Sequence, residues 1–151
     1  MTKQIEGIAG MKELVGEHLG YSPYTEVTQD QVQKFADATG DHQWIHVDVE
    51  RATAGPFGVP IAHGYLTLSL GPMLSPQIFT VTGISMGVNY GAGKVRFPSP
   101  VPVGSKVRLG ATLQSVEDVK GGAQVQMEFV FEVEGSEKPS CVAEVIFRYY
   151  E

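Results

Sequence analysis

The chain has 151 residues, of which 42% are hydrophobic and 19% charged, and its formal net charge is −6. Such values describe one globular domain over residues 1–151 that buries its core without disulfides. The negative charge argues against nucleic-acid binding, and a single cysteine, Cys141, excludes an intramolecular disulfide. Because no segment reads as a membrane span or a signal peptide, we expect a cytoplasmic protein without a membrane partner.

The first third of the chain alternates helical and irregular patterns. Tyr24–Val27 is a short β-prone stretch, and Thr28 followed by Gln31 is a capping-box pattern that opens a helix. Gly40 ends that helix as a left-handed cap, and Asp48 is an N-cap for another short helix. Before them, helical spacing of apolar residues predicts one or two short amphipathic helices, with inner positions at Ile5, Ile8, Met11, Leu14, Val15 and Leu19.

The rest of the chain predicts one buried helix followed by a sheet. Residues 64–74 are apolar on all sides, which indicates a helix buried on every side, and Pro72 should kink or end it. Wrapping the following antiparallel strands around this helix gives an α+β fold whose unpaired edge strand favours edge-to-edge association. Alternation and turn signals place these strands near residues 84–90, 95–97, 106–116, 123–133 and 141–150.

One window of the acidic chain is basic. Residues 84–116 contain Lys94, Arg96, Lys106 and Arg108 and no acid. In each pair the cations alternate with apolar residues, so they lie on one face of a strand. Antiparallel pairing of the two strands would bring all four together as a seat for an anionic substrate tail. The alternative is a solvated strand face.

Two short segments carry the candidate chemistry. Asp41 and His46 lie five residues apart in irregular backbone after a helix, where an acid and an imidazole can hold one water between them. His63 and Gly64 begin the buried helix, whose first backbone N–H groups could form an oxyanion hole. The alternatives are a turn cap for Asp41, a buried structural imidazole for His46, a structural hydrogen bond for His63 and a tight helix entry for Gly64.

Other chemistries lack a signature in this sequence. His42 and His46 are four residues apart, but Gln43 stands where the helical zinc-protease motif has glutamate. Cys141 lies in an alternating strand without a histidine nearby in sequence. We therefore expect no metal site, no serine or cysteine nucleophile, and no nucleotide-binding glycine loop.

The two segments resemble a known motif. Gly40-Asp41 followed by His46, and then residues 62–64, are similar to the hydratase motif of MaoC-like, (R)-specific enoyl-CoA hydratases. Residues 40–48, with Asn-Tyr-Gly at 89–91 and residues 94–101, resemble the branch related to nodulation protein N. The resemblance runs from about residue 11 to the C-terminus. Gln-Trp at 43–44 departs from the commoner Asn-Pro, and Pro72 stands where some relatives place a hydroxyl residue.

The resemblance implies a hotdog fold, in which an antiparallel sheet wraps a long central helix, and a homodimer with joined sheets. It implies that Asp41 and His46 are the catalytic dyad, which adds water to a trans-2-enoyl-CoA to give the (R)-3-hydroxyacyl-CoA. The Gly64 amide, with His63 beside it, would bind the thioester oxygen. Coenzyme A belongs to the substrate, and no other cofactor is implied. Trp44, Phe57 and Tyr65 are candidates for an acyl tunnel, or equally for core.

Two other functions remain open on the same fold. A hotdog thioesterase would hydrolyse the same thioester, but it usually needs a carboxylate on or beside the central helix, and residues 64–79 contain no acid. A non-catalytic acyl-thioester-binding hotdog protein would need neither Asp41 nor His46, and both are present. The sequence therefore favours the hydratase, an enzyme of fatty acid metabolism.

Overall fold

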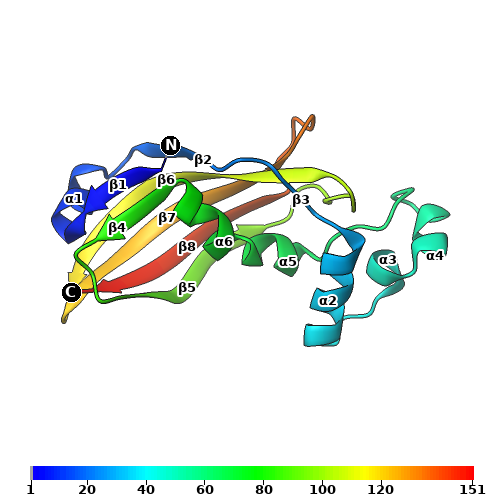
Figure 1. Ribbon diagram of the computed structural model, residues 1–151, viewed down its shortest axis with the longest axis horizontal. Coiled ribbons are helices and arrows are strands. Elements are labelled where there is room, and N and C mark those ends of the chain that lie inside the picture. Colours follow the sequence, from blue (N-terminus) through cyan, green and yellow to red (C-terminus); the bar gives the residue numbers. More distant parts are fainter. Residues whose placement is uncertain (1) are drawn as a thin grey trace.

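The computed structural model describes residues 2–151, and its main feature is a curved antiparallel sheet (Figure 1). The strands follow the order β2-β6-β7-β8-β5, and β3 also pairs with β6. A separate two-stranded parallel sheet joins β1 (Lys3–Glu6) to β4 (Phe79–Thr82). The strands of the main sheet are β2 (His18–Tyr21), β3 (Thr25–Glu26), β5 (Met86–Arg96), β6 (Lys106–Val119), β7 (Gly122–Val133) and β8 (Cys141–Tyr150).

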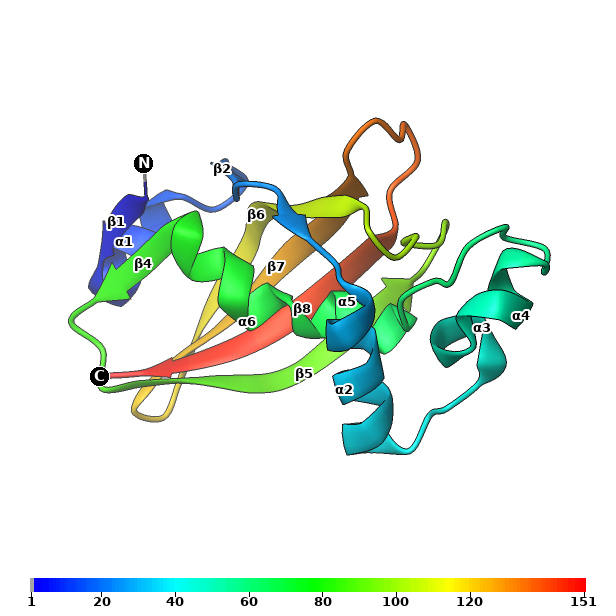
Figure 2. The same ribbon diagram turned by 45° about the vertical axis from the view of Figure 1, so that its right-hand side comes forward.

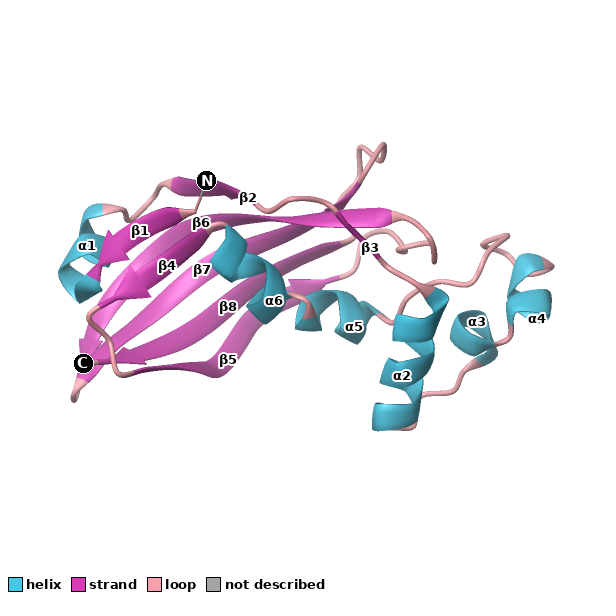
Figure 3. Ribbon diagram, in the orientation of Figure 1, coloured by secondary structure: helices cyan, strands magenta, loops and turns pink. Residues whose placement is uncertain are grey.

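A broken helix crosses one face of this sheet (Figure 3). It consists of α5 (Gly64–Ser69), α6 (Gly71–Leu74) and a 3-10 turn at Ser75–Gln77. Its core-facing side chains recur every four residues and join the sheet's inward-facing side chains in one cluster. Full burial of each such side chain contributes about 1.5–3 kcal/mol. The cluster includes Leu66, Leu70, Leu74, Phe129 and Phe131.

The expectation of a helix buried on every side is wrong in part. The side of α5 and α6 away from the sheet is not covered by any part of residues 2–151, so Tyr65 is 71% exposed and Met73 46% exposed. The break falls at Leu70, the shared boundary of the two helical segments. Pro72 lies in the first turn of α6, where its missing N–H costs no hydrogen bond.

Two expectations about strands also differ from the structure. The first twenty residues contain β1, α1 (Gly7–Glu13) and β2 rather than helices alone. Ile5 is buried in β1 because it pairs with Val81 of β4, far away in the sequence. The strands expected near 84–90 and 95–97 are a single strand, β5. Its register is irregular after Asn89 and after Ala92, and these irregularities bend the strand without ending it.

Three helices form an arm at one end of the sheet (Figure 2). They are α2 (Gln29–Thr39), α3 (Trp44–Val47) and α4 (Val49–Thr53). The predicted caps are confirmed: Thr28 Oγ1 accepts from the Gln31 amide, Gly40 has φ of 85°, and Asp48 Oδ1 accepts from the Arg51 amide. These caps stop α2 and start α4, and thereby hold the intervening segment beside the start of α5.

None of the helices between residues 2 and 151 combines the length and the apolar character that crossing a membrane requires.

Candidate active site

His46 lies in α3 and is held by hydrogen bonds at both its ring and its backbone. Its Nδ1 lies 2.7 Å from the Ile61 carbonyl oxygen, and Gln29 Nε2 donates to the His46 carbonyl at 2.8 Å. Because a carbonyl only accepts, Nδ1 carries the proton and Nε2 keeps its lone pair. The residue is 6% exposed. Burial, with His63 nearby, lowers the pKa of His46 below its usual value, so the neutral form with a basic Nε2 is favoured.

Asp41 follows the Gly40 cap, and its carboxylate lies near Nε2 of His46. Its side chain is 51% exposed, and its Oδ2 lies 4.0 Å from His46 Nε2 and 4.0 Å from His63 Nε2. A separation of 4.0 Å is too long for a direct hydrogen bond but matches two groups that share a water molecule. The structure therefore brings the Asp41 carboxylate and the His46 imidazole together, and their catalytic role stays a prediction.

His63 contacts both Asp41 and His46. Its Nε2–H donates to the Asp41 carbonyl oxygen at 3.0 Å, and its ring stacks on His46 with centroids 3.9 Å apart and an angle of 22°. The residue is 2% exposed. Of the two roles that the sequence left open, the structural hydrogen bond is the one present here, because Nε2 is engaged by Asp41.

Gly64 begins α5 and, together with His46, lines a pocket of about 310 Å³. A Cβ atom on Gly64 would lie 2.9 Å from Cγ of Phe97, so the space beside its Cα is filled by that ring. The first backbone N–H groups of a helix have no partner within the helix, which leaves the Gly64 amide as a candidate donor. The lining includes His46, Phe57, Gly64, Thr67, Phe97 and Ser140.

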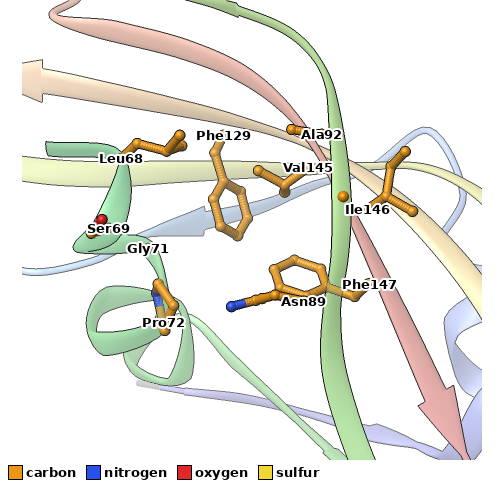
Figure 4. A pocket seen from close by; sticks show the side chains of 11 residues that line it. Leu68, Ser69, Gly71, Pro72, Asn89, Ala92, Phe129, Val145, Ile146 and Phe147 are labelled. Atoms are coloured by element: carbon orange, nitrogen blue, oxygen red, sulfur yellow. The ribbon is translucent and has the colours of Figure 1, made fainter. Parts of the chain in front are cut away.

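A second pocket of about 330 Å³ lies between the central helix and strands β5, β7 and β8 (Figure 4). Its walls are mostly apolar, with the Asn89 amide directed into it. Of this lining, the sequence singles out Pro72 and Asn89 through the resemblance. It could not single out the apolar positions, because inward-facing residues that fill a core and those that line a cavity share one pattern. The lining includes Leu68, Gly71, Pro72, Asn89, Phe129, Val145 and Phe147.

The expected acyl-tunnel residues are distributed differently. Phe57 lines the pocket that contains His46. Tyr65 points away from the core and is mostly exposed. Trp44 packs against Gly55, where a Cβ would lie 2.9 Å from the Trp44 ring, and lies under the Arg51 guanidinium at 4.3 Å. Trp44 therefore stabilises the arm.

The four basic residues are not gathered in one place. Strands β5 and β6 lie apart in the sheet, so the expected pairing of the two basic strands is wrong. Lys94 and Arg96 of β5 share a pocket with Glu128 of β7 and Glu144 of β8. The window therefore has acidic neighbours in space that its sequence lacks.

On β6, Arg108 belongs to a different environment, and Lys106 lies opposite Glu26 of β3 in the strand register. The guanidinium of Arg108 contacts Glu132 at 2.9 Å and lies 3.9 Å from the centroid of the Tyr21 ring. This arrangement is the strand face that the sequence left as the alternative for Arg108.

The ligand atoms of Asp41, His46 and His63 lie within 4.8 Å of one another, so the donor set bears on metal binding. Both Nε2 atoms lie 4.0 Å from Asp41 Oδ2, but Nε2 of His63 carries a proton and offers no lone pair to an ion. The Nε2–H of His63 is also directed at the Asp41 carbonyl. This geometry suits acid–base chemistry better than a shared ion.

An antiparallel sheet around a central helix, with an acid–imidazole pair at the start of that helix, is the arrangement of a hotdog-fold dehydratase. The family model described as MaoC like domain matches residues 11–134. The chain belongs to the MaoC-like dehydratase family, and the family and fold predicted from the sequence are confirmed.

Similarity to individual proteins agrees with this. The chain is 54% identical over 148 residues to 3-hydroxyacyl-thioester dehydratase Z of Mycobacterium tuberculosis, covering 97% of this chain and 98% of that protein. It is 41% identical over 143 residues to nodulation protein N of Rhizobium leguminosarum bv. viciae, covering 90% and 86%. The unliganded structure of R-hydratase PhaJ1 from Pseudomonas aeruginosa has a TM-score of 0.76 at 21% identity, covering 96% and 86%.

Proposed function

We propose that the chain is an (R)-specific enoyl-CoA hydratase, which adds water to a trans-2-enoyl-CoA to give the (R)-3-hydroxyacyl-CoA. The reverse reaction is the dehydration of a 3-hydroxyacyl thioester, which is the activity that the name of the M. tuberculosis relative states. The observation that carries the proposal is the 4.0 Å separation of Asp41 Oδ2 and His46 Nε2 beside the first residue of α5.

The dyad accounts for both halves of the addition. A water molecule donates its hydrogens to Asp41 Oδ2 and His46 Nε2, and its oxygen forms the new bond to C3 of the enoyl group. The electron pair of the C2–C3 double bond moves toward the thioester carbonyl. One member of the dyad takes a proton from the water, and a proton is returned to C2, so the product gains one water in total.

Activation of C3 needs a partner for the thioester oxygen, which becomes negatively charged as water adds. We assign this role to the Gly64 amide at the start of α5, where the helix dipole also favours negative charge. One such donor contributes on the order of 10²–10³ in kcat. His46 and Gly64 line the same pocket, which supports their joint action.

The rest of the substrate fits neighbouring features. The apolar pocket in Figure 4 suits an acyl chain. Lys94 and Arg96 are our candidates for the phosphates of coenzyme A, because both are exposed and line one pocket, which they share with Glu128 and Glu144.

We also propose a homodimer that pairs along β5. This strand is the last in the sheet and has β8 as its neighbour on one side. Exposed Met86 and Tyr90 on β5 and Phe97 after it would be covered by a second copy. Sedimentation analysis should give twice the 16.3 kDa mass of the chain; a monomer at micromolar concentration that hydrates crotonyl-CoA would contradict the dimer.

The reaction is tested with crotonyl-CoA and purified protein. We expect loss of the conjugated-enoyl absorbance without release of free thiol, and a product that an (R)-specific but not an (S)-specific 3-hydroxyacyl-CoA dehydrogenase oxidises. Thiol release would indicate the thioesterase. No change with crotonyl-CoA or with longer enoyl chains would indicate a non-catalytic acyl-thioester-binding protein.

A further inference from the structure

We propose that His63 is a positioning residue. It holds the Asp41 main chain and the His46 ring in their relative positions without touching the substrate. The inference rests on the proposed hydration reaction for its kinetic consequences, whereas its geometric basis is independent of any substrate. It assigns to His63 a role other than a share in the oxyanion hole.

The hydrogen bond of His63 ties two separate parts of the chain. Asp41 lies in irregular backbone between α2 and α3, and its carboxylate accepts only a long bond of 3.3 Å from the Gln43 amide. The bond from His63 Nε2 to the Asp41 carbonyl, at 3.0 Å, links this segment to the start of α5 across 22 residues. Without that bond, nothing else described for Asp41 fixes its distance from the central helix.

The ring of His63 also fixes the orientation of the His46 ring. The bond from Nδ1 of His46 to Ile61 holds one ring atom but still lets the ring plane tilt. Stacking on His63 at 3.9 Å limits this tilt, and Phe35 packs on His63 with centroids 4.8 Å apart. The combination directs Nε2 of His46 toward Asp41 Oδ2.

Both nitrogens of His63 are unavailable to a substrate. Nε2 is engaged by the Asp41 carbonyl, which as an acceptor requires the proton on Nε2. Nδ1 is buried and has no hydrogen-bond partner within residues 2–151. His63 is also absent from the lining of the pocket that contains His46 and Gly64. A group with this environment acts through its neighbours.

Two substitutions separate the two contributions. His63→Phe keeps a flat ring against His46 and loses the N–H donor, whereas His63→Gln keeps an N–H donor and loses the stack. We expect each to lower kcat about 10–100-fold with KM changed little, since misplacing a catalytic group by about 1 Å costs up to ~10²-fold. The matched control is His42→Phe, because His42 is exposed and bonds Asp37 outside the dyad.

A measurement without substrate distinguishes this inference from the proposed reaction. In the wild-type protein, ¹⁵N NMR of the imidazoles should show the Nε2–H tautomer for His63 and the Nδ1–H tautomer for His46. In His63→Phe, the NMR titration midpoint of His46 should rise, because His63 is one of the groups that lower the His46 pKa.

The outcomes are distinct. The opposite tautomers in the wild type would overturn the positioning role, even if both variants fail to fold. Wild-type kcat and an unchanged His46 titration in folded variants would overturn it while leaving the hydratase intact. Expected tautomers and titration shifts in a protein inactive toward every enoyl thioester would support the positioning role and remove the proposed reaction.

Discussion

The ring of Phe97 lies directly against Gly64, so closely that a Cβ on Gly64 would be 2.9 Å from Phe97 Cγ. Phe97 follows β5, the strand at the sheet edge, and Gly64 begins the central helix. The same ring meets Tyr65 edge-on, with centroids 6.1 Å apart. The candidate oxyanion glycine is therefore packed against the end of the edge strand. A substitution of Gly64 should change the packing of Phe97, and a substitution of Phe97 should change the space beside Gly64.

Gly64→Ala should destabilise the protein because Phe97 blocks the added methyl group. Gly64 is not among the glycines with positive φ, so the backbone itself accepts alanine. Overpacking of this kind costs about 1–3 kcal/mol. The measurement is a double-mutant cycle of unfolding free energies with Phe97→Leu, in which the second substitution should restore most of the loss. Equal destabilisation of Gly64→Ala in both backgrounds would contradict the packing argument.

Asp41→Asn should leave the fold intact and lower kcat about 10²–10⁴-fold, the range for a positioned acid–base group. The amide is isosteric and keeps an oxygen for the Gln43 amide, but it does not take a proton from water. Asp37→Asn is the matched control, since Asp37 is an exposed carboxylate bonded to His42 and Gln33. Steady-state hydration kinetics check both variants, and wild-type turnover in folded Asp41→Asn would exclude Asp41 from the dyad.

The elements that the sequence predicts well are those fixed by local chemistry. Thr28, Gly40 and Asp48 act through bonds or dihedral angles within a few residues, so their patterns locate helix ends directly. The β6–β7 turn at 120–121 and the long alternating strands are equally local. Asp41 and His46 lie near each other because both belong to the short segment between the caps at Gly40 and Asp48, whereas we assign their final positions to the contacts with His63.

The predictions that are wrong concern features that depend on contacts with residues far away in the sequence. Ile5 is in a strand because β4 lies beside it, and the apolar spacing of a helix cannot indicate that partner. Lys94 and Arg96 are separated from the β6 cations because β7 and β8 intervene in the sheet. Sequence spacing places residues on faces of elements, whereas the order of strands comes only from the packed fold.

The kcat/KM for hydration should fall at acid pH, with a midpoint below the ordinary histidine pKa of about 6.5. Burial lowers the pKa of His46, so the basic form persists further into acid. Between that lowered pKa and about 6.5 the unfolded chain binds more protons than the folded one, so stability also falls as pH drops. A kcat/KM profile and unfolding midpoints from pH 4 to 8 test this. An acid limb centred above 6.5 would contradict it.

Leu68→Trp should shorten the acyl chains that the protein accepts. Leu68 projects into the apolar pocket of Figure 4, and a larger ring would fill part of its roughly 330 Å³. We expect KM for octenoyl-CoA to rise while KM for crotonyl-CoA stays nearly constant. Met73→Trp is the control, because Met73 is on the same helix but is solvent-exposed. An equal rise in KM for both substrates would place the acyl chain elsewhere.

Charge reversal should separate the basic residues into two groups. Lys94→Glu and Arg96→Glu should raise KM for coenzyme A thioesters and spare short pantetheine thioesters, because only the former carry the nucleotide phosphates.

Arg108→Glu should leave both KM values unchanged. It would place a carboxylate opposite Glu132, which Arg108 now contacts at 2.9 Å, so its effect should appear in stability. Paired kinetics on the two thioesters and thermal unfolding of each variant provide the measurement. If Lys94→Glu and Arg96→Glu change the two KM values equally, the β5 cations are solvated surface, and the phosphates of coenzyme A bind elsewhere.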